Sequence, residues 1–240
     1  MEAALTERTR AVVVVSPNNP TGSYLKRSEA DALLALCAER GLALVADEVF
    51  ADFALGRDDR RVTSVAGRDE ALTFALGGLS KSCGLPQLKL AWTAVSGPAG
   101  ARDEALARLE VIADTYLSVG TPVQQALPDL LSALPELQAP MRARTAANLA
   151  ALRAAVAAAP AVSVLVPEGG WSCVLRVPAT ASEDEWCSRL LRDDAVLVQP
   201  GYFFDFEAEA FLVLSLLPRE DVFAEGIARI VARASAMDVL

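Results

Sequence analysis

The sequence predicts an α/β protein with a mostly parallel sheet, and three observations support that prediction. Short apolar runs rich in β-branched residues alternate along the chain with segments of helical periodicity. The first of these runs, residues 11–15 (AVVVV), is apolar throughout, as expected of a strand buried on both faces. The chain has 240 residues, of which 53% are hydrophobic, which is enough to bury a substantial core.

The first half of the chain is expected to form strands and helices in quick succession. The turn SPNNPTG over residues 16–22 stops the first strand, because two prolines and a glycine cannot continue a hydrogen-bonded ladder. Ser28, with Asp31 three residues later, predicts the start of a helix that ends at Gly41. The further strands predicted in this half cover residues 42–46, 71–76 and 90–95.

From Gly97 onward, helices are predicted before a second group of strands. We expect helices over residues 98–114, 122–134 and 141–159, one opened by Ser182 with Glu185, and a closing helix from Pro218. The predicted strands cover residues 162–166, 173–177, 195–199 and 211–216. The segment LPELQAPM contains two prolines in eight residues and indicates a domain boundary near Leu134–Met141. The second lobe is then a smaller α+β domain.

Composition excludes several functional classes. The net charge of −9 and the scattered basic residues argue against a nucleic-acid partner, and the apolar runs are too short to span a membrane. The chain has no histidine, which excludes Ser-His-Asp and Cys-His catalysis and histidine-ligated zinc. The four cysteines form no C-x-x-C pair and no signal peptide opens the sequence, so we expect a cytoplasmic protein with reduced thiols and no metal site.

Polar residues follow three of the predicted strands, where an open α/β sheet binds its ligands. Because the carboxyl ends of parallel strands meet at one edge, an amide, a carboxylate and an amine are expected together there. Taken singly, each residue is explained as well by a turn, a helix cap or a solvated loop lysine. In chain order, the residues are Asn18 and Asn19, Asp47 and Glu48, and Ser80 and Lys81.

In this order, the segments SPNNPTG, ADEVF and LSKSCGLPQLKLAW resemble the aminotransferase class I/II family of fold-type I pyridoxal-phosphate-dependent enzymes. The resemblance continues through TYLSVGTPVQ, EGGW and QPGYFFDF and covers nearly the whole chain. It implies that residues 1–134 are the C-terminal part of the large cofactor-binding domain and residues 135–240 the small C-terminal domain. It also implies amino-group transfer between an amino acid and a 2-oxo acid, with pyridoxal 5'-phosphate as cofactor.

The resemblance assigns roles to matching positions of this sequence. Lys81 would form a Schiff base with the cofactor aldehyde and then shuttle a proton as a free amine. Asp47 would pair with the pyridinium nitrogen and keep the ring an electron sink. Asn19 would donate a hydrogen bond to the phenolic oxygen of the ring. Lys89 and Ser80 would contact the cofactor phosphate.

The sequence also departs from the family pattern at several positions. Phe50 stands where the family commonly has a tyrosine that donates to the phenolic oxygen. Gly78 and Lys89 replace a serine and an arginine that contact the phosphate, so that Lys89 supplies a point charge without a bidentate fork. Val213 replaces the arginine that clamps the substrate carboxylate. Arg176, on the strand after EGGW, is the candidate substitute, although alternation along VLRVP equally allows it to point at solvent.

Family members also carry an N-terminal portion that precedes the matched region. We therefore expect a fragment whose full-length form is a homodimer of amino acid biosynthesis. Two alternatives remain open at this point: another pyridoxal-phosphate reaction such as elimination or decarboxylation, or a non-catalytic fragment that binds a complementary N-terminal half. The amino donor and the oxo-acid acceptor are not indicated.

Overall fold

The computed structural model describes residues 2–116 and 118–237, and the chain divides into two compact units. The first unit comprises Met1–Pro17, Tyr24–Asp52 and Arg57–Gln138. The second comprises Asn18–Ser23, Phe53–Gly56 and Ala139–Leu240. Within the described residues, no helix combines the length and apolar character that crossing a membrane requires.

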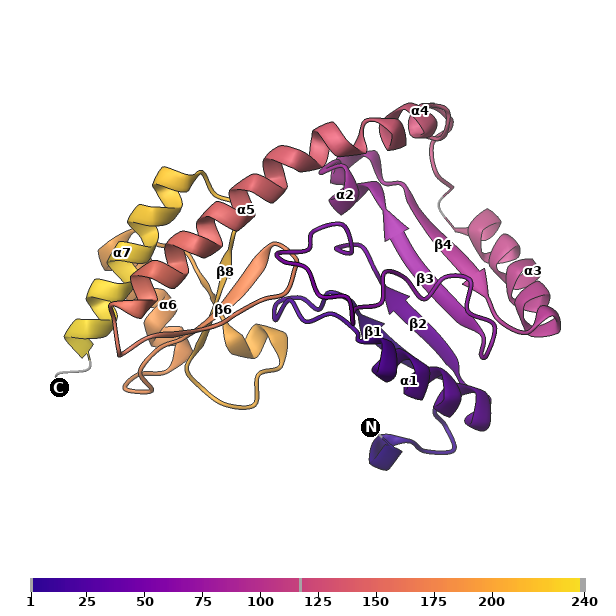
Figure 1. Ribbon diagram of the computed structural model, residues 1–240, viewed down its shortest axis with the longest axis horizontal. Helices are drawn as coiled ribbons and strands as arrows, with labels where there is room; N and C mark the ends of the chain where they lie inside the picture. The colour runs from indigo at the N-terminus through magenta and orange to yellow at the C-terminus, as the bar shows by residue number, and fades with distance from the viewer. Residues whose placement is uncertain (1, 117, 238–240) are drawn as a thin grey trace. The chain divides into compact units, whose positions relative to one another are not determined.

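Four strands form the sheet of the first unit, in the order β1-β2-β3-β4 (Figure 1). β1 pairs with β2, and β2 with β3, in parallel, whereas β4 is antiparallel to β3. The predicted α/β class with a mostly parallel sheet is confirmed. The elements are β1 (Ala11–Val15), α1 (Arg27–Arg40), β2 (Ala43–Asp47), β3 (Thr73–Gly78), α2 (Leu79–Ser82), β4 (Ala91–Ser96), α3 (Ala99–Thr115) and α4 (Thr121–Ser132).

Helix α1 begins one residue earlier than its predicted cap. Lys26 is the residue before the helix, and its backbone N–H donates to the Glu29 carboxylate at 2.8 Å. Ser28 therefore lies inside the first turn, and the predicted opening at Ser28 is wrong. The predicted end at Gly41 is confirmed, because this glycine adopts the left-handed conformation at φ 63° that terminates many helices.

The two faces of this sheet differ in what covers them. One face packs against α1, where Leu33, Leu34 and Cys37 meet the alternate strand residues Val12, Leu44, Ala46 and Ala75. The opposite face carries an apolar row that runs in register across all four strands. That row consists of Val13, Val45, Phe74 and Val95, and Val13 is 67% exposed.

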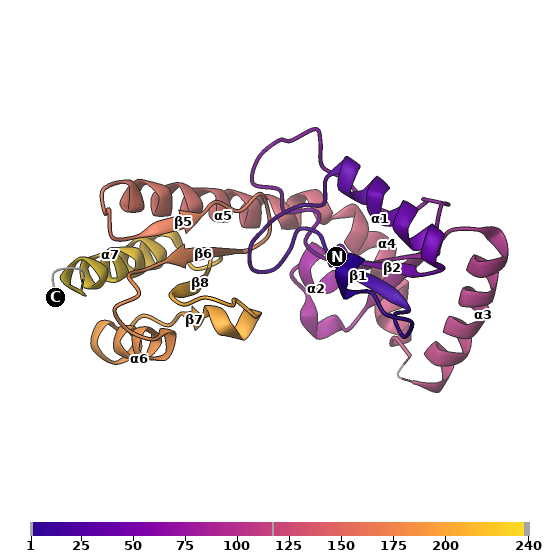
Figure 2. The same ribbon diagram turned by 90° about the horizontal axis from the view of Figure 1, so that it is seen from below.

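A second sheet, antiparallel throughout, organises the second unit in the order β5-β6-β8-β7. Figure 2 shows α6 next to β7, the edge strand of this sheet. The elements are α5 (Leu134–Ala157), whose first turns belong to the first unit, β5 (Ser163–Leu165), β6 (Ser172–Arg176), α6 (Glu183–Asp194), β7 (Gln199–Pro200), β8 (Phe211–Ser215) and α7 (Glu220–Met237).

Two predictions for this half need correction. The predicted strand over residues 195–199 is wrong, because Ala195 is left-handed at φ 54° where α6 ends and only Gln199–Pro200 pairs with β8. The helix predicted over residues 141–159 begins earlier, because α5 runs from Leu134 through both prolines of LPELQAPM. Pro135 lies in the first turn of α5, where its missing N–H breaks no helical bond, and Pro140 lies inside the same helix. The division of the chain into domains 1–134 and 135–240 stays a prediction.

The predicted helix start at Ser182 is confirmed, since its hydroxyl accepts the Glu185 N–H at 3.3 Å. The helix then contributes to one continuous core between the sheet and α5, α6 and α7. The largest fully buried side chain of that core, Trp186, donates its indole N–H to the Pro178 carbonyl at 3.1 Å. Other members of the core are Leu152, Leu175, Leu190, Leu212, Leu216 and Ile230.

Candidate functional site

The carboxyl ends of β2 and β3 carry the carboxylate and the amine that the sequence analysis singled out. Asp47 is the last residue of β2 and pairs in register with Leu76 of β3. Lys81 lies in the short helix α2, which follows β3 directly. Since β2 and β3 are parallel, both residues lie at the same end of the sheet, where the carboxyl ends of these strands meet. The first unit thus supplies both groups from neighbouring strands.

The Asp47 side chain is half-buried and oriented by its own turn. One carboxylate oxygen, Oδ1, accepts the backbone N–H of Val49 at 3.1 Å. Its neighbour Ala46 is buried in the cluster beneath α1, so alternation places Asp47 on the opposite face of the sheet. That face is the one with the apolar row. The carboxylate therefore stands at the end of an apolar sheet face.

The loop after Asp47 is fixed at several points. The Tyr24 hydroxyl donates to the Ala51 carbonyl at 3.0 Å. The Glu48 carboxylate accepts the Ser64 hydroxyl at 2.6 Å and the Val65 N–H at 2.7 Å. Glu48, the second acidic residue of the predicted pair, therefore has a structural role. These bonds hold the backbone on either side of Phe50.

Phe50, in the loop that follows β2, contacts the lysine that follows β3. The Lys81 Nζ lies 5.4 Å from the centroid of the Phe50 ring, within the range of a cation–π contact. Both side chains are half-buried. The phenyl ring that replaces the expected tyrosine thus contacts the lysine ammonium itself. This contact limits the positions that the flexible lysine side chain can adopt.

Two glycines lead from β3 into the turn that carries Lys81. A Cβ on Gly77 would lie 2.3 Å from Nε1 of Trp92, so no larger residue fits under this indole ring. A Cβ on Gly78 would lie 3.2 Å from the Ala91 Cβ and from the Leu90 carbonyl oxygen, which is tighter than ordinary contact. The close approach of β4 leaves little room for a side chain at position 78, where the family resemblance leads one to expect serine.

A small apolar cluster supports the turn itself. Leu79 and Cys83, on either side of Lys81, are buried with Leu90. Burial raises the pKa of the Cys83 thiol, and the Asp52 carboxylate raises it further. Cys83 therefore stays protonated near neutral pH and serves as packing, not as a nucleophile. The partly buried side chains around this cluster come mainly from α4 and the start of α5: Leu85, Leu88, Val119, Val123, Leu127, Leu130, Leu134 and Leu137.

The two predicted phosphate contacts occupy different surroundings. Ser80 is half-buried and directly precedes Lys81 in α2. Lys89 is exposed and adopts the left-handed conformation at φ 52°, where it ends the 3-10 turn Pro86–Leu88. The next residue, Leu90, is joined to the turn of Lys81, since the Leu79 N–H donates to the Leu90 carbonyl at 3.1 Å.

Asn19, the remaining predicted site residue, belongs to the second unit and is exposed. Its turn is closed by the Asn18 amide, which donates to the Thr21 hydroxyl at 2.8 Å. Gly22 is left-handed at φ 73°, and a Cβ there would lie 2.4 Å from that of Pro167. Only glycine can occupy this position, and the turn is thereby held against the chain that leads to β6.

The strand residues that bear on substrate binding also lie in the second unit. Val213 is buried in the middle of β8, paired with Val174, and provides no charge for a carboxylate. Arg176 ends β6 and is exposed. Alternation places Val174, Arg176 and Val213 on one face of the sheet, opposite the face that packs into the core.

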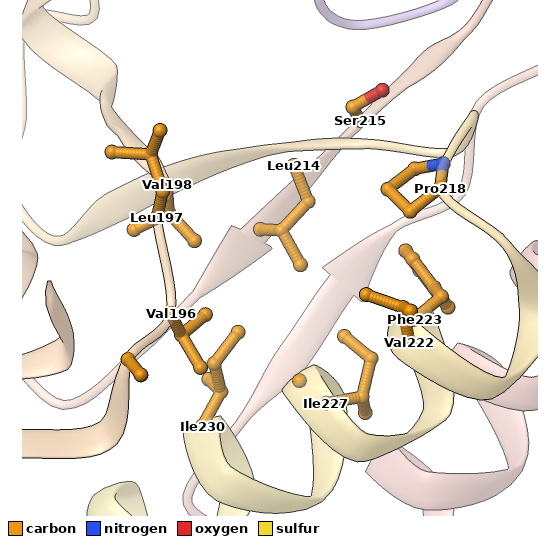
Figure 3. Close-up of a pocket in the computed structure, with 12 residues that line it drawn as sticks. Val196, Leu197, Val198, Leu214, Ser215, Pro218, Val222, Phe223, Ile227 and Ile230 are labelled. Carbon is orange, nitrogen blue, oxygen red and sulfur yellow. The ribbon is translucent and has the colours of Figure 1, made fainter.

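The second unit also contains an apolar pocket of about 180 Å³ between residues 195–198, β8 and α7 (Figure 3). Figure 3 shows Leu214, Ile227 and Ile230 directed into it. The lining is almost entirely apolar, and none of the six predicted site residues takes part in it. The pocket lacks the polar groups that chemistry requires, so it is not the candidate site.

Sequence reasoning missed two residues that the structure places beside the candidate site. Asp52 and Gln138 are 86 positions apart, and the Gln138 amide nitrogen donates to the Asp52 carboxylate at 2.9 Å. No spacing or motif indicates a contact over such a distance, and glutamine near the start of a helix usually faces solvent. Burial of Gln138 is visible only in the fold.

Comparison with known proteins places the sequence among aminotransferases. It is 31% identical over 239 residues to arginine–pyruvate transaminase of Pseudomonas aeruginosa, covering 98% of this chain and 58% of that protein. It is 26% identical over 238 residues to an alanine aminotransferase of Mycobacterium bovis, covering 96% of this chain and 55% of that one. The chain thus spans a little more than half the length of these relatives.

Solved structures support the same fold. An alanine aminotransferase from Pyrococcus furiosus matches with a TM-score of 0.86 at 19% identity, covering 100% of this chain and 60% of that one. An aminotransferase from Escherichia coli matches with a TM-score of 0.83 at 24% identity, covering 98% and 59%. The predicted fold-type I transferase fold is confirmed. Residues 1–228 match the family described as aminotransferase class I and II, and the chain therefore belongs to that family.

Proposed function

We propose that this chain supplies the lysine and the carboxylate of a pyridoxal-phosphate-dependent aminotransferase. The enzyme would move an amino group between an amino acid and a 2-oxo acid. The observation that carries the proposal is the Lys81 amine, half-buried 5.4 Å from the Phe50 ring, at the sheet edge where Asp47 ends the neighbouring strand. Membership of the family supports it independently.

The residues present fit pyridoxal 5'-phosphate, the cofactor of this family. The cofactor needs a primary amine for its aldehyde and an anion for its protonated ring nitrogen. Asp47 provides the anion from the end of β2, and Lys81 provides the amine from α2, which follows the adjacent parallel strand β3. The second Asp47 oxygen, Oδ2, accepts no hydrogen bond from the described residues, which leaves it available to a donor. The fit is thus a matter of complementary charge and chemistry.

When bound, the cofactor provides a reactive aldehyde and a ring that withdraws electrons from the substrate α-carbon. Asp47 would hold the proton on the ring nitrogen, because its negative charge favours the protonated form. The Lys81 amine would bind the aldehyde carbon and, once released, carry a proton to and from the substrate. Phe50 would provide an apolar surface beside this amine that excludes water.

The phosphate and the phenolic oxygen are assigned to the remaining residues. Ser80 would donate its hydroxyl to the phosphate, and Lys89 would add a positive charge. Asn19 would donate its side-chain amide to the phenolic oxygen. Support for these three roles comes from the family resemblance of their motifs. Support for full-length assembly as a cytoplasmic homodimer of amino acid biosynthesis has the same origin, and sedimentation analysis of the full-length protein tests the dimer.

A labelling experiment tests the proposal directly, because the chain has only three lysines, Lys26, Lys81 and Lys89. The purified protein is incubated with pyridoxal 5'-phosphate, reduced with borohydride and mapped by peptide mass spectrometry. We expect one cofactor group per chain, bound to Lys81, at concentrations that leave Lys26 and Lys89 mostly unmodified. Equal modification of all three lysines would contradict the proposal.

Matched variants distinguish the site from general lysine reactivity. Lys81→Arg keeps the positive charge beside Phe50 but removes the nucleophilic amine, and should abolish the selective adduct. Lys26→Arg, at an amine that donates to the Tyr24 carbonyl at 3.0 Å, should leave it unchanged. Asp47→Asn should weaken retention of the cofactor without changing which lysine reacts.

A further inference from the structure

We propose that Gln138 is a positioning residue for the Lys81 amine. It would hold the turn that carries Lys81 at a fixed distance from the loop that follows Asp47. The inference rests on the function proposed above, because that function requires these two segments to act together. It is carried by one buried amide that bonds to both.

The Gln138 side chain is 4% exposed and makes two hydrogen bonds through the same nitrogen. Its Nε2 donates to Oδ2 of Asp52 at 2.9 Å and to the Ser82 carbonyl oxygen at 3.1 Å. An amide nitrogen has two hydrogens, so both bonds can form at once. The reverse orientation would direct the amide oxygen at two acceptors. The environment thus specifies a donor with two hydrogens at this position.

The two acceptors belong to the two segments of the candidate site. Ser82 directly follows Lys81 and is the last residue of α2. Asp52 ends the loop that begins after Asp47 and contains Phe50. A change in the distance between these segments would alter the 5.4 Å contact of the Lys81 amine with the Phe50 ring. Small displacements of reacting groups cost large factors in rate.

Helix α2 needs such support because it is a single turn of four residues. Short helices do not persist without tertiary contacts. Leu79 and Cys83 anchor α2 by apolar packing, and the Leu79 N–H bonds to β4. The Ser82 carbonyl is one of the terminal carbonyls that a helix leaves without an internal donor. Gln138 supplies that donor, and fixes the C-terminal side of the turn.

Three variants separate the hydrogen bonds from simple packing. Gln138→Leu removes the donors and keeps a similar volume. Gln138→Glu places a second carboxylate against Asp52, and adding Asp52→Asn restores a donor to that pair. Gln124→Leu on α4 is the matched control, because the exposed Gln124 amide also donates to a backbone carbonyl, that of Val119, at 2.8 Å.

Two readouts are taken, and the first needs no cofactor. Hydrogen exchange of the Cys83 and Gly84 amides reports opening of the turn, since these donate to Leu79 and Lys81 at 3.1 and 3.2 Å. The second readout is the ratio of borohydride-trapped cofactor at Lys81 to that at Lys89. Thermal unfolding of each variant is recorded alongside.

We expect Gln138→Leu to accelerate exchange at Cys83 and Gly84 about tenfold and to lower the Lys81 to Lys89 ratio by a similar factor. Gln138→Glu should do at least as much, and Asp52→Asn should recover part of the loss. Unchanged exchange in Gln138→Leu, or an equal change in Gln124→Leu, would overturn the proposal. Should Gln138→Leu not fold, failure of Asp52→Asn to improve on Gln138→Glu would overturn it as well.

These outcomes are distinct from a failure of the proposed function. That function fails if the unaltered chain shows no selective adduct at Lys81. The exchange measurement on the unloaded chain still decides whether Gln138 holds the turn. The trapping ratio then decides whether holding the turn directs the lysine.

Discussion

The two units bury their apolar residues in different ways. In the second unit, seventeen of the described residues form one continuous cluster between the sheet and three helices. In the first unit, ten residues pack beneath α1 and a separate cluster of three surrounds the turn of Lys81. The candidate carboxylate and amine both belong to the unit with the divided core. Polar residues at strand ends interrupt apolar packing, so the core of the first unit is divided where that of the second is continuous.

The largest expected effect tests whether the second unit unfolds independently of the first. Trp186→Ala removes its largest buried side chain and should lower the free energy of unfolding by about 3–5 kcal/mol. Hydrogen exchange should show loss of protection in β6 and β8 while β1–β3 keep theirs. Parallel loss in both sheets would break the comparison, because the two units would then unfold as one. Leu34→Ala on α1 is the counterpart in the first unit.

A smaller effect is expected at Glu183, the charged group buried within the second unit. Its carboxylate is 3% exposed and accepts the N–H groups of Tyr202 at 2.8 Å and Phe211 at 2.7 Å. Glu183→Leu should cost about 2–3 kcal/mol in urea unfolding, since two buried donors lose their acceptor. Glu183→Gln should cost less because one oxygen remains. A neutral result would mean that water replaces the carboxylate. Glu225→Gln, in an exposed helical ion pair, is the control.

The next largest effect is expected at alkaline pH, which should destabilise the second unit more than the first. Burial raises the pKa of Cys173 from 9.0 to about 12 and that of Cys187 to about 11. Below pH 9 both thiols are protonated in the folded and in the unfolded chain, so they do not change the free energy of unfolding with pH there. As pH rises from 9 toward these values the unfolded chain ionises first, and stability falls by about 1.4 kcal/mol per pH unit for each thiol.

The measurement for this prediction is urea unfolding at pH 8 and pH 10, followed through both units by hydrogen exchange. Cys173→Ala should abolish the part of the pH dependence that this thiol causes. Equal alkaline losses in the two units would show that Cys37 and Cys83, whose pKa values burial also raises, matter as much.

The smallest expected effect concerns the surface of the first unit. The Arg68 guanidinium pairs with Glu70 and with Asp31 of α1, and lowers the pKa of Glu70 to about 2. A lowered pKa contributes stability above the unfolded value of 4.5 that is lost as pH falls toward 2. Because these groups are solvent-accessible, Glu70→Gln should cost less than about 1 kcal/mol at pH 7. Acid unfolding at low and high salt provides the measurement, and a salt-independent loss would contradict it.

Most of the fold follows from local patterns, and the exceptions have physical causes. AVVVV indicates β1 and FLVLS indicates β8 because runs of apolar and β-branched residues favour strands. The expected burial of β1 on both faces is wrong, since Val13 is 67% exposed and only Val12 of that strand is buried. The Ser182 and Glu185 pair sets the start of α6 through two reciprocal local hydrogen bonds. The segment 195–199 has the composition of a strand, but most of it finds no partner. Pairing is decided by the whole sheet, which no local pattern contains.

In the candidate site too, some residues are indicated by local sequence motifs and others only by tertiary contacts. Lys81 and Asp47 stand at strand ends, so motif order indicates them from the sequence alone. The contact of Lys81 with Phe50 and the bonds of Gln138 depend on tertiary packing across the first unit. Gly78 shows the limit most clearly: a Cβ at this position would lie only 3.2 Å from the Ala91 Cβ of β4, a proximity that only coordinates reveal.

The indole of Trp92, which lies over Gly77, has an optical consequence. The chain has three tryptophans, and Trp171 and Trp186 both belong to the second unit. Trp92 is 39% exposed and Trp186 is fully buried, so the red-shifted part of the tryptophan emission would come largely from Trp92, eleven positions after Lys81. A chromophore bound at Lys81 would quench that emission by energy transfer, so the first unit contains its own fluorescent reporter.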